Sequence, residues 1–188
     1  MITALFALLS AAIAAAVALL VADRTRYVNA VTAQRSEWIE KLRNNLAKYS
    51  GIIRSMNYKI GASGYNLQSA EHYESIRQAN DLIPLIKLQL NPFGKIDNNI
   101  VRLLDKMAAL AEKADGKRLV EADKLFIEHS RWLLKAEWEK VKSEAAGILF
   151  CGIVVRRGSK ENEHEYLNRY RTFCDGAGNL AKLDEPTQ

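Results

Sequence analysis

The uncharged stretch that follows Met1 constrains the fold more than any other part of the chain. Residues 2–22 (ITALFALLSAAIAAAVALLVA) contain no Asp, Glu, Lys or Arg. An α-helix rises about 1.5 Å per residue, so a helix of this length covers about 30 Å, the thickness of the hydrocarbon core of a bilayer. The sequence therefore predicts a transmembrane helix at residues 2–22, and no other stretch is long and apolar enough to form one.

The predicted span has two unlike faces. At about 100° per residue, bulky apolar residues cover one face and small residues with two hydroxyls cover the other. Helices in lipid associate through small residues, so this face predicts packing in a homo-oligomer, with a tetramer as the first estimate, or the wall of a narrow pore. An alanine-rich anchor that does not self-associate is the alternative. The residues expected on the packing or pore face are Thr3, Ala7, Ser10, Ala11, Ala14, Ala15 and Ala18.

All of the excess positive charge follows the predicted span. The net charge is +5, and residues 23–60 hold eight Lys and Arg against three Asp and Glu, so 8 − 3 accounts for the whole excess. Basic residues beside a span stay on the cytoplasmic side, which predicts a single-pass protein with its N-terminus outside and a cytoplasmic C-terminal domain. A signal peptide cleaved near Ala18 is the alternative, although it lacks a positively charged leader. Cys151 and Cys174 form no paired motif, which fits reduced cytoplasmic thiols.

The rest of the chain has the periodicity of an all-α protein. Residues 23–60 contain no proline and carry one apolar stripe, so the span is expected to continue as one long helix. Later helical patterns indicate an antiparallel cytoplasmic bundle. They are expected at residues 70–90, 97–113 and 118–146, with a short one at 161–173. The expected divisions are a transmembrane helix at 1–22, a basic juxtamembrane helix at 23–60, a cytoplasmic helical bundle at 61–157 and a polar C-terminal tail at 158–188.

Single residues set the expected helix ends and their packing. Ser69 and Asp97 are expected to be N-caps, and the sequence LNP at residues 90–92 is expected to stop the second helix. Tyr73 is expected to face inward. The apolar segment ILFCGIVV at residues 148–155 is too short to span a membrane and is expected to pack in the bundle, against the membrane face or against a neighbouring subunit.

No pattern of reactive residues indicates an enzyme. His72, His129 and His164 stand far apart without ligand spacing, so each is expected to be a surface or capped histidine rather than a metal ligand. Glu137 and Glu139 lie among lysines, which is typical of a solvated helix face with local ion pairs. The chain has no Walker motif and no nucleophile elbow. We therefore expect neither catalysis nor a cofactor or metal.

The basic residues below the predicted span are the candidate binding site. A plain interpretation is attraction to anionic lipid headgroups. In an oligomer the same residues would ring a common axis and could bind a nucleotide or oligonucleotide, with Tyr27 or Trp38 stacking on bases. Arg35 lies on the apolar face, either buried against a carboxylate or placed at a subunit interface or ligand site. The residues expected to bind an anionic ligand or lipid are Arg24, Arg26, Arg35, Lys41, Arg43 and Lys48.

Three stretches carry a resemblance to known proteins: RSEWIEKLR at residues 35–43, LNP at 90–92 and LLKAEWEKVK at 133–142. Together with the N-terminal span they resemble a family of small bacterial single-span proteins. The layout is similar to the membrane effectors of antiphage defence, in particular the channel of the Hailong type.

The resemblance implies a place in the bacterial inner membrane and an ion channel. It also implies a DNA oligomer, made by a partner nucleotidyltransferase, that controls the channel, so that depolarisation and growth arrest follow infection. A non-conducting, membrane-tethered helical scaffold that recruits a protein or anionic lipid is the alternative.

Overall fold

A computed structural model describes residues 2–61, 66–146 and 154–183 of the chain. Within these ranges the side chains of Ile2, Ala4, Leu5, Leu8, Arg24, Lys182 and residues 143–146 and 154–163 are not described. The described residues form α-helices and one short 3-10 helix, and they contain no strand, which confirms the expected all-α class. In chain order the elements are α1 (Ile2–Ile60), α2 (Ala70–Gln89), α3 (Lys95–Glu112), α4 (Gly116–Ala146), α5 (Val154–Asp175) and η1 (Leu180–Leu183).

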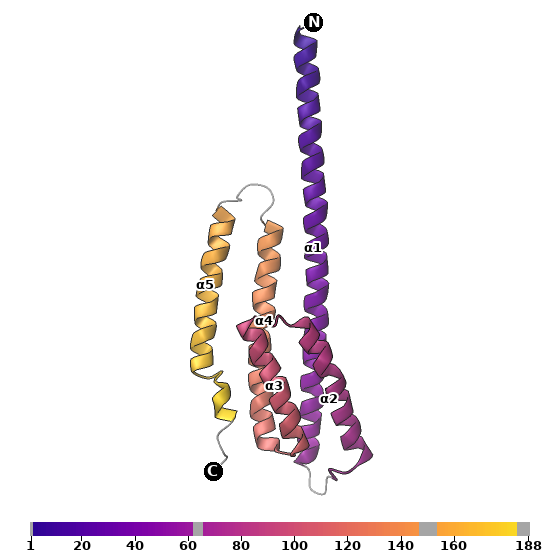
Figure 1. The fold of residues 1–188 in the computed structure, drawn as a ribbon, viewed down its shortest axis with the longest axis vertical. Helices are drawn as coiled ribbons and strands as arrows, with labels where there is room; N and C mark the ends of the chain where they lie inside the picture. The colour runs from indigo at the N-terminus through magenta and orange to yellow at the C-terminus, as the bar shows by residue number, and fades with distance from the viewer. Residues whose placement is uncertain (1, 62–65, 147–153, 184–188) are drawn as a thin grey trace.

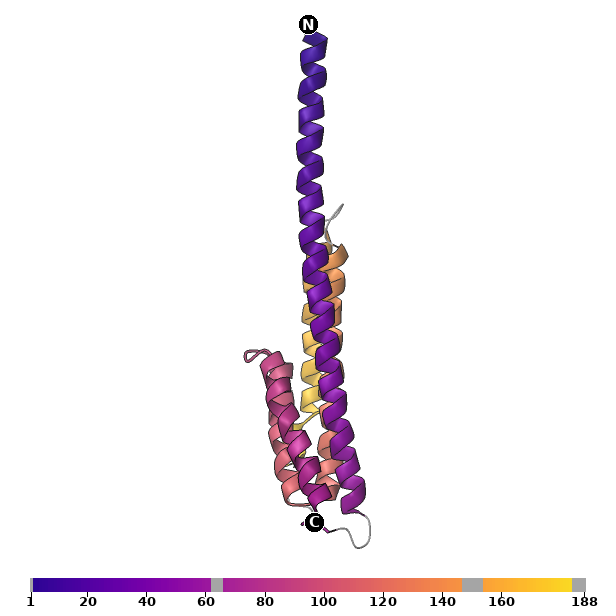
Figure 2. The ribbon, with the colours of Figure 1, turned by 90° about the vertical axis from the view of Figure 1, so that its right-hand side faces the viewer.

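The helices after α1 fold back along its C-terminal half. α1 packs against α2 and α4, α3 packs against α2 and α4, and α5 packs on α4. Successive helices run up and down, so the expected antiparallel bundle is confirmed (Figure 1). The N-terminal half of α1 projects past the ends of all the other helices (Figures 1 and 2).

α1 runs without interruption through 59 residues, which confirms that the first helix continues into the basic segment. The apolar stripe of its C-terminal half forms one wall of the core, and its buried members are Ile39, Leu42, Leu46, Tyr49, Ile53 and Met56. Among the residues that the structure describes, no helix is both long enough and apolar enough to cross a membrane. The span expected at residues 2–22 finds no support in this fold and stays a prediction.

The helix ends follow the local signals, with one correction. Ser69 is the N-cap of α2, where its hydroxyl accepts a hydrogen bond from the backbone N–H of His72 at 3.2 Å. Asp97 is not the N-cap of α3, as expected from the sequence, because Gly94 occupies that position. The buried Asp97 carboxylate instead accepts from the backbone N–H of Asn91 at 2.9 Å and fixes the α2–α3 turn. A Cβ at Gly94 would lie 2.0 Å from that carboxylate, so a larger residue there would displace the Asp97 side chain.

Several expected environments are also corrected. Tyr73 was expected to face inward, but its side chain is 60% exposed, and α2 buries His72, Ala79, Leu82 and Ile86 instead. Of the histidines expected to be on the surface or capped, His164 is exposed, and His129 is buried with both ring nitrogens hydrogen-bonded. His72 is buried rather than on the surface. The ion pairs of Glu137 with Lys140 and Glu139 with Lys142 confirm the expected local pairing. Glu139 lies on a solvated face as expected, whereas the Glu137 side chain is only 15% exposed. The apolar segment at residues 148–155 lies outside the described side chains.

The C-terminal region packs more closely on the bundle than its polar composition suggests. α5 is longer than the helix expected at residues 161–173, and Tyr166, Tyr170 and Phe173 pack around Trp132 of α4. Leu183 of η1 is also buried in the core. α5 and η1 therefore complete the core on the side of α4 opposite α1 (Figure 1).

Candidate functional site

The N-terminal half of α1 is exposed on both of its faces. All seven residues expected to pack or to line a pore are exposed, from Thr3 to Ala18. Ser10 donates its hydroxyl to the carbonyl of Ala7 at 2.9 Å, so its side chain is held against its own helix. On the bulky face Phe6 is 66% exposed and Leu20 is 71% exposed. No other element covers these side chains within the described part of the chain.

The basic residues expected to bind an anion have different environments on α1. Arg26, Lys41, Arg43 and Lys48 are exposed, Arg35 is half-buried, and the side chain of Arg24 lies outside the described residues. Lys41 forms an ion pair with Glu37 at 2.7 Å, one turn away on the same exposed face. The structure therefore keeps most of these cations at the surface, but it does not gather them into one cluster.

The two basic flanks of α1 face different neighbours. On the flank that carries Lys41 and Lys48, Lys59 pairs with Glu71 of α2 at 2.6 Å. On the flank that carries Arg43, Arg54 pairs with Asp123 of α4 at 2.7 Å. The lysine flank thus borders α2, and the arginine flank borders α4.

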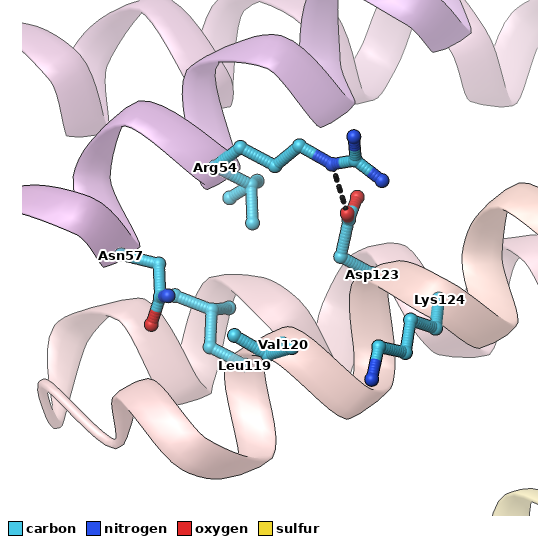
Figure 3. Close-up of a pocket in the computed structure, with 7 residues that line it drawn as sticks. Arg54, Asn57, Leu119, Val120, Asp123 and Lys124 are labelled. Atoms are coloured by element: carbon cyan, nitrogen blue, oxygen red, sulfur yellow. Dashed lines mark hydrogen bonds and ion pairs between the residues drawn. The ribbon is translucent and has the colours of Figure 1, made fainter.

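A small pocket of about 140 Å³ lies where the arginine flank meets α4 (Figure 3). Its wall combines apolar side chains with an amide, a carboxylate and two cations. The lining residues are Ile53, Arg54, Asn57, Leu119, Val120, Asp123 and Lys124.

Asp123 organises this pocket. Its carboxylate is 5% exposed, and its two oxygens accept hydrogen bonds from the Ser50 hydroxyl at 2.6 Å and from Arg54 Nε at 2.7 Å. Figure 3 shows Arg54 reaching from α1 to Asp123, with Lys124 next along α4. The Arg54 side chain is 64% exposed, so its terminal nitrogens remain open to solvent. The buried carboxylate therefore orients a cation at the mouth of the pocket.

The chemistry of this site suits a bound anion. Guanidinium and ammonium groups donate several hydrogen bonds to phosphate oxygens, and Arg does so in a planar fork. The described residues contain no group of His, Cys, Asp and Glu that could hold a metal ion. Cys174 is a free thiol that accepts a long hydrogen bond from Asn99 at 3.6 Å, away from this pocket.

Comparison with known proteins adds no relative: no family model, no curated protein and no solved structure matches the chain.

Asp123 and Lys124 are the site residues that the sequence did not reveal. Arg54 could be placed on the arginine flank from its phase on α1, but its partner comes from a helix that follows after more than sixty residues. One signal was present, because Asp123 lies between Leu119, Ala122 and Phe126 on the buried face of α4. A carboxylate on a buried face needs a cation or hydroxyl partner, and Arg54 and Ser50 supply both.

Proposed function

We propose that this protein is an oligomeric membrane effector, in which an anionic ligand on the basic side of α1 controls the apolar half of the same helix. In this proposal the apolar halves of several copies associate in a bilayer and form an ion channel. The observation that carries it is the continuity of α1, which joins residues 2–22 to the basic flanks without a break. Because no flexible linker separates the two ends, a rotation or displacement at one end of such a helix is transmitted to the other end.

The exposure of the apolar half adds to this argument. Contiguous apolar surface is costly in water at about 25 cal/mol per Å², and large exposed patches mark membrane or protein contacts. The small face with Ala7, Ala11 and Ala18 suits contact between copies, and the bulky face suits lipid. The resemblance to Hailong-type effectors adds the biological context, which is antiphage defence with a nucleotide or DNA-oligomer signal and growth arrest after depolarisation.

Membrane potential in bacteria that express the protein tests this function. We expect the wild-type chain to depolarise the inner membrane, and Ala11→Leu with Ala15→Leu to abolish depolarisation because larger side chains keep the helices apart. Ile13→Leu with Val17→Leu, on the bulky face, is the matched control and should remain active. Full polarisation in cells whose membrane fraction contains the wild-type protein would refute the channel.

A non-conducting scaffold is the second candidate, and one observation favours it. Leu88 is 85% exposed and Phe93 is 92% exposed at the α2–α3 turn, where a partner protein could bind. A scaffold needs the first helix only as a tether. Replacement of residues 2–22 by an unrelated transmembrane helix would therefore preserve the function of a scaffold and destroy that of a channel.

A further inference from the structure

We propose that a phosphate-rich polyanion, such as a single-stranded oligonucleotide, binds in the solvent-facing groove between α1 and α4. Arg24 and Arg26, which lie next to the expected membrane span, are not part of this site. This inference rests on the proposed function for the idea that an anion is the signal. It adds which residues bind the anion, and it relates the side of α1 that carries the site to the side that carries the small residues of the N-terminal half. The groove is defined by Arg43 and Arg54 of α1 and by Lys124, Arg131 and Trp138 of α4.

The cations of the groove lie in two rows, one on α1 and one on α4. Arg43 and Arg54 are eleven residues apart on α1, which is about three turns, so they project from nearly the same side of the helix. Lys124, Arg131 and Trp138 follow one another at intervals of seven residues on α4, which is about two turns each. Arg54 and Lys124 both line the pocket, which fixes the two rows on the same groove.

The antiparallel packing sets Arg43 and Arg131 at the same height. Ser50 contacts Asp123 through a 2.6 Å hydrogen bond, which gives a common reference level on the two helices. Arg43 lies seven residues before Ser50, and Arg131 lies eight residues after Asp123, so both are roughly 11 Å farther along the bundle. The groove thus presents cations at two levels along its length. Arg131 pairs with Glu128 at 2.8 Å, but its side chain is 72% exposed, so its other nitrogens remain open to solvent.

Trp138 gives the groove an aromatic surface beyond the second level of cations. Its side chain is 45% exposed, and Lys142 lies 6.0 Å from the centre of its ring. An exposed ring beside cations can stack on a nucleobase while the cations hold the backbone, and stacking contributes about 1–3 kcal/mol per base in other proteins. The combination favours a nucleic acid strand over an inorganic anion.

Distance separates this groove from lipid headgroups. If residue 22 marks the membrane boundary, Arg43 lies about 30 Å and Arg54 about 50 Å from it at 1.5 Å per residue. The Debye length at physiological ionic strength is about 8 Å, so the surface charge of the membrane does not reach these cations. Arg24 and Arg26 lie close enough for lipid and remain the candidates for that role.

The groove also faces the same side of α1 as the small residues of the N-terminal half. Ala7 and Arg43, and likewise Ala18 and Arg54, are 36 residues apart, which is about ten turns of an α-helix. Figures 1 and 2 show α1 as one nearly straight helix, so the two sides stay roughly aligned. When the small faces of several copies meet, their grooves turn toward the shared axis. A polyanion there would contact more than one copy and so bias how the apolar halves pack.

Fluorescence anisotropy with the detergent-solubilised full chain tests the site. The probe is a fluorescein-labelled single-stranded DNA of about twelve nucleotides. We expect Arg43→Gln with Lys124→Gln to weaken binding at least tenfold and to reduce the slope of log K against log salt by about 1.4, the value for two lost phosphate contacts on a single strand. Lys41→Gln with Lys48→Gln removes the same charge from the other flank of α1 and should change the affinity less than threefold.

Binding to phosphatidylglycerol vesicles is measured in parallel for the same variants. Three results would overturn the proposal: no binding of the DNA by the wild-type chain, an equal loss of DNA affinity in both double variants, or a loss of vesicle binding but not of DNA binding in the Arg43 and Lys124 variant. Arg43 and Lys124 are exposed and make no ion pair within the described residues, so their double variant is expected to keep the wild-type thermal midpoint. The Lys41–Glu37 pair is exposed on both sides and contributes little to stability, so the control variant is expected to keep it as well. The assay does not depend on conduction. If the wild-type chain binds the DNA but does not depolarise cells, the groove stands as a binding site and the channel is refuted. If the wild-type chain depolarises cells but the two double variants lose DNA affinity equally, the channel stands and the groove is refuted.

Discussion

Asp123 joins the two helices of the candidate site through two hydrogen bonds. Its carboxylate is almost fully buried, yet both oxygens are satisfied, one by Ser50 and one by Arg54. A buried carboxylate is costly unless paired and hydrogen-bonded, so removal of one partner leaves an uncompensated group. This side chain therefore links α1 to α4 and holds the position of Arg54.

We expect Asp123→Asn to lower the free energy of unfolding by about 2 kcal/mol, because the amide cannot accept from both Ser50 and Arg54 and presents a donor to one of them. Chemical denaturation measures this loss. Asp105→Asn is the matched control: Asp105 pairs with Lys87 at 2.6 Å, but the Asp105 carboxylate is 59% exposed, so the loss should stay below about 1 kcal/mol. Similar losses in the two variants would show that burial of Asp123 is not what gives the pair its strength.

At this scale the sequence predicts one helix better than it predicts pairs between helices. The phase of Arg43 and Arg54 on α1 follows from a period of 3.6 residues, and so does the burial of Leu42, Leu46 and Tyr49. The Asp123 contact depends on how α4 is rotated and shifted against α1. That arrangement is set by packing of the whole core, so periodicity within one helix does not contain it.

At the scale of elements, α5 and η1 are held to the bundle by a buried polar network around His129. The Nε2 atom of His129 lies 3.2 Å from the carbonyl oxygen of Gly178, which can only accept, so Nε2 carries the proton. In the neutral ring Nδ1 then accepts from the Tyr170 hydroxyl at 2.7 Å, and that hydroxyl accepts from Asn99 at 2.8 Å. α3, α4, α5 and the turn before η1 are thus connected through one histidine.

This network predicts that the docking of α5 weakens in acid. Burial lowers the pKa of His129 below its ordinary value of 6.5, although the Gly178 carbonyl and the nearby Glu128 oppose that shift. The unfolded chain then binds more protons than the folded chain below about pH 6.5, so stability falls as the pH drops through that range. We expect thermal unfolding to show this fall in the wild type and a flatter profile in His129→Gln.

His164→Gln is the control for this pH profile, because His164 is exposed and should leave the slope unchanged. The difference between variants is the readout, because each variant changes one histidine and keeps every other titratable group. An unchanged slope in His129→Gln would mean that the network does not resist protonation.

The boundaries of the elements were more predictable than the packing of the C-terminal region. Ser69, the LNP stop at residues 90–92 and the stripe of α3 give the helix ends and the buried side of α3 directly. α5 was harder, because its rings are interspersed with charged residues and its pattern looks amphipathic but weak. Gly178 belongs to the same packing: a Cβ there would lie 2.3 Å from the Phe173 ring, which no periodic pattern reveals.

At the scale of the whole molecule, the chain divides into a compact bundle and a long projecting half-helix (Figure 1). The bundle ends along α1 near residues 28–31, where side chains change from half-buried to exposed. Beyond this point α1 has no neighbour in the described chain. Whatever the bundle binds can reach the apolar half only through the helix itself, so the stiffness of α1 at this junction is the property that the proposed function needs.

Asn29 lies at this junction and is exposed, so it tests that stiffness without touching the core or the groove. Asn29→Pro removes a backbone hydrogen bond and clashes with the preceding turn, which costs about 3 kcal/mol and kinks the helix. We expect the variant to keep its place in the membrane fraction and its DNA affinity but to lose depolarisation, whereas Asn29→Ala should keep all three. A kinked helix transmits neither rotation nor translation along one axis. If the proline variant still depolarises cells as the wild type does, the two halves of α1 act independently.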